Sequence, residues 1–344
     1  MTLAGETLAG VTLAGVTLAG VTLARRSILA AAAALPAAAL LPRGAAAQQR
    51  FESIFMFIPA GPGGGWDGTG RAIEQAARAA GLVGSFQFEN VGGAGGMVGL
   101  PRFVNQRRNQ ANALMVGGSV MVGAGITNKS PITIVNVQPV ARLTEEAGVV
   151  VVPGNSDIRD WAGLAARLRA NPGSVPVGGG SAGGTDHIAL GLILKALGRN
   201  PREASYVAFA GGGPANAAIL GGQVGAGISG YSEFAEQIKA GRMRALATTG
   251  QTRIPGTDIP TLRELGVDVV AANWRGVFCG PGLTPPQRQA LIDLMTAIHA
   301  TPQWKEILSL RAWSDAFLTG DAFAAFLKED IAATEGVLKD LGLA

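Results

Sequence analysis

Two glycine-rich segments of similar design stand between an apolar run and a helical stretch. The first reads Pro-Ala-Gly-Pro-Gly-Gly-Gly-Trp-Asp at 59–67, and the second reads Gly-Gly-Gly-Ser-Ala-Gly-Gly-Thr-Asp-His at 178–187. A strand, a glycine loop and a helix in this order are typical of α/β folds, where such loops follow the carboxyl ends of parallel strands. Because ligands bind at that edge of a parallel sheet, the two loops predict a binding site.

The start of the helix after each loop indicates what this site would bind. Asp67 and Thr185 are favourable N-cap residues, and the first N–H groups of a helix carry positive partial charge. Glycine allows a ligand to approach these N–H groups closely. Neither loop contains lysine or arginine, and the sequence lacks the phosphate-binding pattern Gly-x-x-x-x-Gly-Lys-[Ser/Thr]. The pattern therefore favours a small carboxylate over a polyphosphate.

Apolar runs and amphipathic stretches alternate along the rest of the chain. The runs predict strands at 53–59, 86–89, 113–116, 149–152, 175–178, 206–209, 226–229, 245–248 and 274–279. The stretches predict helices at 68–80, 161–170 and 185–197, and a largely helical tail at 285–341.

This order of elements predicts an α/β protein with two lobes, each a mostly parallel sheet flanked by helices. We expect two crossover strands near 147–152 and 270–278. The first lobe would contain residues 48–146 and 272–344, and the second lobe residues 147–271.

The first 47 residues read as segments that precede the fold. Residues 1–24 repeat a pentapeptide, and the period of five fits neither a helix nor a strand. Residues 25–47 read as a signal peptide, with Arg25-Arg26, an apolar run and a small-residue cleavage site that ends at Ala47. The arginine pair resembles a twin-arginine signal. We therefore expect export to the periplasm.

The composition excludes several classes of protein. Only 15% of the residues are charged and 48% are hydrophobic, which excludes a disordered chain. The only cysteine is Cys279 and the only histidines are His187 and His299, so we expect no disulfide, metal centre or cofactor. The net charge is +4 without a run of basic residues, so we expect no binding to nucleic acid.

Two further motifs overlap the glycine loops. Residues 63–68 and 178–183 match the dinucleotide pattern Gly-x-Gly-x-x-Gly, which arises easily in a chain with 51 glycines. Residues 179–183 match the nucleophile elbow Gly-x-Ser-x-Gly, with Ser181 as the nucleophile. An exported serine hydrolase that uses Ser181, with Asp293 and His299 as partners, is the alternative to a binding protein.

Several segments, in order along the chain, carry a family likeness: 57–67, 89–96, 178–187, 206–213, 260–266 and 273–276. In these segments the chain resembles the extracytoplasmic solute receptors of tripartite tricarboxylate transporters, the TctC or Bug type, and the likeness extends over 51–343. The resemblance implies a two-lobed periplasmic-binding-protein fold, similar to type II, that closes over a di- or tricarboxylate such as citrate. It also implies no catalysis, a monomer, and delivery of the solute to one large and one small membrane subunit.

The resemblance also implies which residues bind the solute. The two glycine loops would supply backbone N–H groups, and the loops at three further strand ends would line the rest of the site. Carried over to this chain, the implied residues are Ala60, Gly64, Gly65, Trp66, Asp67, Ser119, Ser181, Ala182, Gly183, Thr185, His187, Ala210, Gly211, Gly230 and Tyr231.

Overall fold

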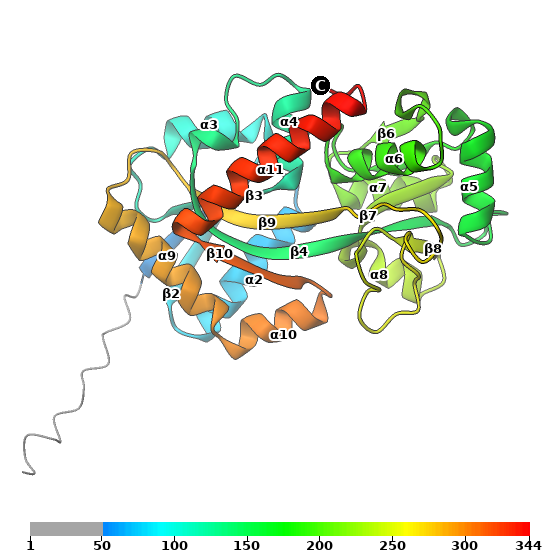
Figure 1. Ribbon diagram of the computed structural model, residues 1–344. Helices are drawn as coiled ribbons and strands as arrows, with labels where there is room; N and C mark the ends of the chain where they lie inside the picture. Colours follow the sequence, from blue (N-terminus) through cyan, green and yellow to red (C-terminus); the bar gives the residue numbers. More distant parts are fainter. Residues whose placement is uncertain (1–50) are drawn as a thin grey trace, which may run out of the picture. The chain divides into compact units, whose positions relative to one another are not determined.

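The structure is a computed structural model that describes residues 51–344 (Figure 1). The pentapeptide repeat at 1–24 and the predicted signal peptide at 25–47 lie outside the described residues. Within the described part of the chain, no helix is both long and apolar enough to cross a membrane.

One mixed sheet of ten strands continues through both lobes. Its strands follow the order β2-β1-β3-β9-β4-β7-β5-β6, and β8 and β10 also pair with β4. The strands are β1 (Phe51–Ile58), β2 (Val83–Asn90), β3 (Ala113–Gly118), β4 (Gln138–Pro153), β5 (Val177–Gly179), β6 (Tyr206–Ala208), β7 (Ala226–Gly230), β8 (Met243–Thr248), β9 (Ala272–Cys279) and β10 (Ser314–Thr319). The parallel pairs are β1–β2, β1–β3, β5–β6 and β5–β7. Every antiparallel pair includes β4 or β9.

Helices cover these sheets in both lobes (Figure 1). They are α2 (Gly65–Ala79), α3 (Gly99–Gln106), α4 (Ser119–Thr127), α5 (Trp161–Ala170), α6 (Thr185–Ala196), α7 (Gly212–Leu220), α8 (Tyr231–Lys239), α9 (Pro285–His299), α10 (Pro302–Leu310) and α11 (Gly320–Asp340). Short 3-10 turns lie at Ala94–Gly96, Ile134–Asn136, Pro172–Ser174 and Pro201–Glu203.

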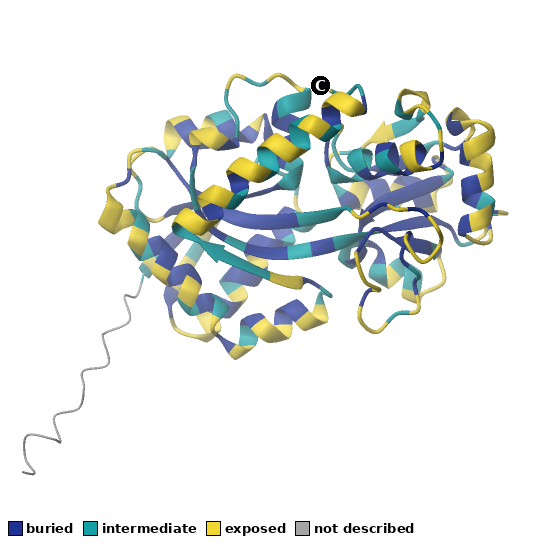
Figure 2. Cartoon of the chain, in the orientation of Figure 1, coloured by how far each residue is buried: buried dark blue, intermediate teal, exposed yellow. Residues whose placement is uncertain are grey.

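Each lobe has its own hydrophobic core. One cluster of buried apolar side chains draws on residues 54–143 and 274–327, and two further clusters draw on residues 149–269. Figure 2 shows this as buried segments at the centre of each lobe, under helices with exposed outer faces. Strand β4 belongs to both lobes, because residues 138–147 pair with β9 and residues 148–153 lie against β7 and β8. The two-lobed α/β fold expected from the sequence is therefore confirmed.

Three details of the secondary structure differ from the predictions. The tail at 285–341 is not wholly helical, because Ser314–Thr319 form β10 and pair with β4. Strand β4 begins at Gln138, well before the predicted 149, because polar residues such as Glu146 interrupt its apolar pattern but are buried by the pairing with β9. Helix α2 begins at Gly65 and not at 68.

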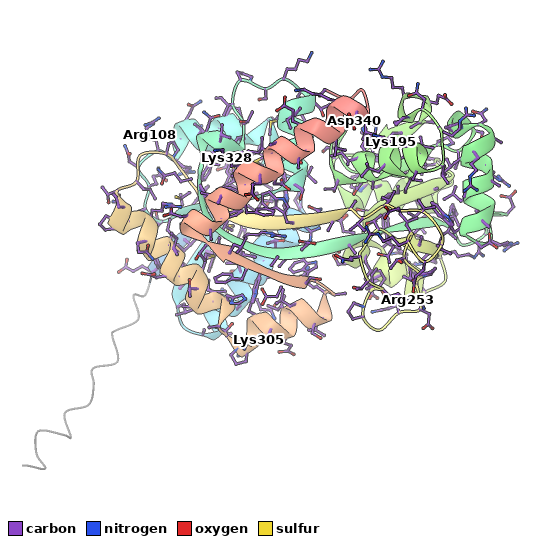
Figure 3. The ribbon with its side chains drawn as sticks, viewed as in Figure 1. Arg108, Lys195, Arg253, Lys305, Lys328 and Asp340 are labelled. Atoms are coloured by element: carbon purple, nitrogen blue, oxygen red, sulfur yellow. The ribbon has the colours of Figure 1, made fainter. Side chains whose placement is uncertain are left out.

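Helix α11 lies along the two long strands and reaches the second lobe. Phe323 on its inner face is fully buried, with ring centroids 5.7 Å from Trp274 and 5.4 Å from Phe278 of β9. Near its other end, Asp340 Oδ2 lies 3.0 Å from Nζ of Lys195 on α6 (Figure 3). The helix therefore packs on the strands that connect the lobes and also contacts both lobes.

Replacing Phe323 with alanine should destabilise the fold by about 3–5 kcal/mol, because the change leaves a cavity among the aromatic rings against β9. Urea unfolding of the purified protein measures this change. Leu310→Ala is the control, because Leu310 is 77% exposed and its loss should change the free energy of unfolding by less than about 0.5 kcal/mol. Equal effects of the two substitutions would contradict the assigned role of Phe323.

Candidate functional site

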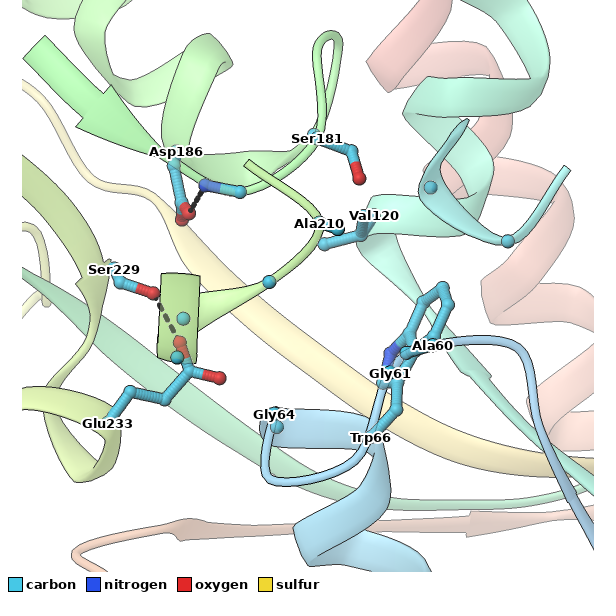
Figure 4. Close-up of a pocket in the computed structure, with 18 of the residues that line it drawn as sticks. Ala60, Gly61, Gly64, Trp66, Val120, Ser181, Asp186, Ala210, Ser229 and Glu233 are labelled. Atoms are coloured by element: carbon cyan, nitrogen blue, oxygen red, sulfur yellow. Dashed lines mark hydrogen bonds between the residues drawn. The ribbon is translucent and has the colours of Figure 1, made fainter. Parts of the chain in front are cut away.

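A cavity of about 290 Å³ lies between the lobes and is lined by residues of both. The first lobe contributes the loop at 59–66, glycines at 93–96 and Val120, and the second lobe contributes residues at 180–186 and 210–214 with Ser229 and Glu233. Asn273 and Arg275 of β9 complete the lining. Figure 4 shows Asp186, Ser229 and Glu233 on one side and Ala60, Gly61, Gly64 and Trp66 on the other.

The structure brings part of the predicted site together at this cavity. The predicted residues that line it are Ala60, Gly64, Gly65, Trp66, Ser181, Thr185, Ala210 and Gly211. The predicted residues that do not line it are Asp67, Ser119, Ala182, Gly183, His187, Gly230 and Tyr231.

Three helices begin at the cavity, and each begins after a glycine. Gly64, Gly184 and Gly211 are the N-cap residues of α2, α6 and α7, and none of these caps supplies a side-chain hydrogen bond. The first N–H groups of a helix have no partner within the helix, so these three starts present donors and positive partial charge. The prediction that Asp67 and Thr185 are the N-caps is wrong, because both residues lie inside the first helical turn.

Asp67 instead holds the first glycine loop in place. Its Oδ2 accepts a hydrogen bond from the N–H of Gly63 at 3.1 Å, and its Oδ1 accepts one from Asn90 Nδ2 at 3.0 Å. Asp67 as a whole residue is 8% exposed. Asp67 therefore shapes the loop from behind and does not face the cavity.

His187 has a similar supporting position in the second glycine loop. Its Nδ1 accepts a hydrogen bond from the N–H of Gly183 at 3.1 Å, and its ring stacks on Tyr206 with centroids 4.2 Å apart. The Tyr206 hydroxyl donates to the carbonyl oxygen of Gly180 at 2.8 Å. Burial lowers the pKa of His187 below its ordinary value, which favours a neutral ring.

Gly183 lies at a contact between the lobes. Its φ of +72° favours glycine, and an added Cβ would lie 2.2 Å from Oγ1 of Thr127 on α4. The next residue back, Ala182, is exposed. The second glycine loop thus touches the first lobe at Gly183 and faces the cavity at Ser181.

The other predicted residues outside the lining support the crossover strands and the second core. Ser119 Oγ accepts a hydrogen bond from the N–H of Trp274 at 2.9 Å. An added Cβ on Gly230 would lie 2.6 Å from the carboxylate of Glu146, and Tyr231 is buried in a core cluster of the second lobe.

Arg275 provides a cation that the glycine loops lack. It is 1% exposed, its Nη1 lies 2.5 Å from Oε2 of Glu146, and its Nε has no hydrogen-bond partner among the described residues. An added Cβ on Gly65 would lie 2.6 Å from Nη2 of Arg275, so the guanidinium lies against the start of α2. Arg275 comes from β9 and lies outside both glycine loops, so the loop motifs give no signal for it.

Two carboxyl groups also line the cavity. Asp186 accepts a hydrogen bond from the N–H of Gly180 at 2.8 Å, and Glu233 accepts one from the hydroxyl of Ser229. Burial and the nearby charge of Glu233 raise the pKa of Asp186 to about 7, although the hydrogen bonds from Gly180 and Thr185 oppose this shift. Burial also raises the pKa of Glu233, although Arg275 and Ser229 oppose the shift.

Sequence reasoning missed these carboxyl groups as site residues for two different reasons. Asp186 lies in a quoted motif, directly after Thr185, and its place at the helix start was a usable signal. Glu233 lies outside the two glycine-rich loop motifs. It lines the cavity because it lies in the first turn of α8, directly after the end of β7.

The serine hydrolase alternative has no assembled triad. His299 lies on α9, where its Nε2 is 2.9 Å from Asp315 Oδ2 and its ring stacks on Phe317. Asp293 accepts a hydrogen bond from Gln289. Of the two histidines in the sequence, both within 51–344, neither lines the cavity that contains Ser181.

Curated relatives match the chain over different lengths. BugT of Bordetella pertussis is 25% identical over 84% of this chain and 89% of its own length. A UPF0065 protein of Cupriavidus necator, encoded in the gbd 5′ region, is 26% identical over 57% of this chain, and the match covers 59% of that protein.

Solved structures share the fold. MatC of Rhodopseudomonas palustris with bound malate has a TM-score of 0.72 and 22% identity, and the match covers 83% of this chain and 99% of MatC. A second R. palustris protein, with adipate, has a TM-score of 0.76 and 20% identity, and the match covers 85% of this chain and 97% of that protein.

The sequence pattern of one family matches most of the chain. This family is described as the tripartite tricarboxylate transporter family receptor, TctC, and the match extends over residues 73–343. The family consists of solute receptors, and the two-lobed fold with a cavity between the lobes agrees with that description. The chain therefore belongs to the TctC family of solute-binding receptors.

Proposed function

We propose that this receptor captures a small carboxylate in the periplasm and delivers it to the membrane subunits of a tripartite transporter. The observation that carries the proposal is the convergence of three helix starts, each without a side-chain cap, on one cavity. Such N–H groups bind carboxylates through charge-assisted hydrogen bonds. Arg275 adds a buried guanidinium at the same place.

The charges that line the cavity favour a dicarboxylate over a tricarboxylate. Asp186 and Glu233 face the same space as the helix starts, and each additional charge on the solute adds repulsion from them. Malate and adipate, which are bound by structural neighbours, are dicarboxylates. A cavity of about 290 Å³ suits molecules of that small size.

The same proposal includes how the protein works as a receptor. The lobes, 48–146 with 272–344 and 147–271, would close over the solute by bending near 147–152 and 270–278. The protein would act as a monomer that presents its closed form to one large and one small membrane subunit. Export would follow cleavage of the leader near Ala47.

A thermal-shift panel tests the class of solute. A dicarboxylate at 100 times its Kd should add about 2.7 kcal/mol to the free energy of unfolding. Malate, succinate and adipate should raise the Tm, whereas sugars should not. The proposed carboxylate class is wrong if sugars or uncharged amides raise the Tm while every carboxylate is inactive.

A larger side chain at Gly64 tests the role of the helix starts. Gly64 has φ −85° and ψ 177°, which other residues adopt, and an added Cβ meets only Gly61 O at 3.9 Å. Gly64→Leu should therefore change stability by less than about 0.5 kcal/mol. It should weaken carboxylate binding at least about tenfold, or 1.4 kcal/mol, by blocking the start of α2.

Isothermal titration with the best carboxylate of the panel measures this loss. Gly336→Leu is the matched control, because Gly336 is exposed on α11 and an added Cβ there meets no atom within 4 Å. If Gly64→Leu binds as tightly as the control, the carboxylate does not approach the start of α2.

A further inference from the structure

Two carboxyl groups face the cavity from neighbouring elements of the second lobe. Asp186 lies in the first turn of α6 and Glu233 in the first turn of α8, and both line the cavity together with the helix starts (Figure 4). A site for an anion has no evident use for two fixed negative charges. Their presence needs a compensating group.

The compensation does not come from an ion pair. Among the ion pairs of residues 51–344, none includes Asp186 or Glu233. Their identified partners are neutral donors, which are the N–H of Gly180 and the hydroxyl of Thr185 for Asp186, and the hydroxyl of Ser229 and the N–H of Gly65 for Glu233.

The cations beside the cavity, the buried Arg275 and the half-buried Arg311, compensate only part of the charge. Arg275 pairs with Glu146, whose other oxygen accepts the N–H of Ser232 at 2.7 Å. Arg311 lies beside this pair, and the guanidinium carbons of Arg275 and Arg311 lie 5.5 and 4.9 Å from the centroid of the Trp313 ring. Three carboxylates face two guanidiniums, so one carboxylate has no cationic side chain to balance it.

We propose that Asp186 and Glu233 are solute-binding residues, and that Asp186 binds the solute carboxylate as a neutral acid, so that capture takes up one proton. This inference rests on the proposed function. A single proton compensates the remaining charge and converts Asp186 from an acceptor into a donor for the incoming carboxylate. Arg275, which is 1% exposed, lines the same cavity, and its Nε has no hydrogen-bond partner among the described residues.

The proton balance is simple. Above pH 7, Asp186 begins as a carboxylate, an acid of the buffer gives up its proton, and an O–H bond forms on Asp186 as the solute binds. Burial and the charge of Glu233 already raise the pKa of Asp186 to about 7, and a bound anion raises it further. Below pH 6 the group is protonated before binding, so no proton is taken up there.

Other titratable groups near Asp186 do not account for the proposed uptake of a proton. Burial lowers the pKa of His187, so its ring stays neutral above pH 6.5, and burial with the charge of Asp186 raises the pKa of Tyr206 well above 10. Burial raises the pKa of Glu233, but Arg275 and the hydroxyl of Ser229 both favour its charged form. Glu146 remains paired with Arg275.

The experiment measures binding of malate and adipate by isothermal titration between pH 6 and 8.5, where both carboxyl groups of each probe are ionised. Titrations in phosphate and in Tris, which differ in ionisation enthalpy, give the number of protons taken up. We expect uptake to rise from a small fraction of a proton at pH 6 to about one at pH 8. The Kd should increase about tenfold for each pH unit above 7.

Two variants with the same change of charge separate Asp186 from general electrostatics. Asp186→Asn keeps an acceptor for the N–H of Gly180 and presents a permanent donor to the solute. The Kd of this variant should therefore vary less than about twofold across this pH range. Binding to the variant should take up no proton. Glu236→Gln is the control, because Glu236 is exposed on α8 and pairs with Lys239, and it should keep the pH dependence of the wild type.

The titrations of the wild type and of Asp186→Asn decide whether Asp186 takes up the proton. Carboxylate binding with a constant Kd and no proton uptake in the wild type overturns this inference and leaves the proposed function intact. An Asp186→Asn protein that keeps the pH dependence also overturns it. If that variant does not fold, the proton count in the wild type still decides. If neither probe nor any other carboxylate binds at any pH, the proposed function fails, and this inference fails with it.

Discussion

Glu146 and Arg275 face each other from the two long strands that run between the lobes, and both side chains are almost completely buried. Burying a lone charge costs several kcal/mol, so each residue requires the other to remain in place. The N–H of Ser232 satisfies the second oxygen of Glu146 and ties the pair to the second lobe. The ion pair with Glu146 holds Arg275 against the start of α2, where Arg275 lines the cavity.

The lining of the cavity between the lobes is built largely from glycine loops and helix starts. Gly64, Gly184 and Gly211 are N-cap residues that supply no side-chain cap at the starts of three helices. At the first of these starts, the N–H of Gly65 is hydrogen-bonded to the carboxyl group of Glu233. Asp67 and His187 hold the two loops from behind, because they accept hydrogen bonds from the N–H groups of Gly63 and Gly183. Asp67 and His187 therefore have supporting positions, whereas Ser181 and Asp186 of the second loop motif line the cavity.

Two acidic residues of the second lobe, Asp186 and Glu233, add negative charge to the lining of the cavity. Helix starts attract anions, whereas Asp186 and Glu233 repel them unless a proton compensates the charge. The same cavity therefore combines fixed positive partial charge from backbone with a side chain that titrates near neutral pH. A site of this kind distinguishes solutes by their charge as well as by their shape.

The sequence alone determined the α/β class, the two glycine loops and the family, because each depends on residues that are neighbours in the chain. It did not determine the strand β10 or the first half of β4, which form only by pairing with each other and with β9. It also did not show that Glu233 and Arg275 share a cavity with Gly64. These residues are far apart in sequence and are buried beside one another only after the strands pair, so the contacts that place them exist only in the tertiary structure.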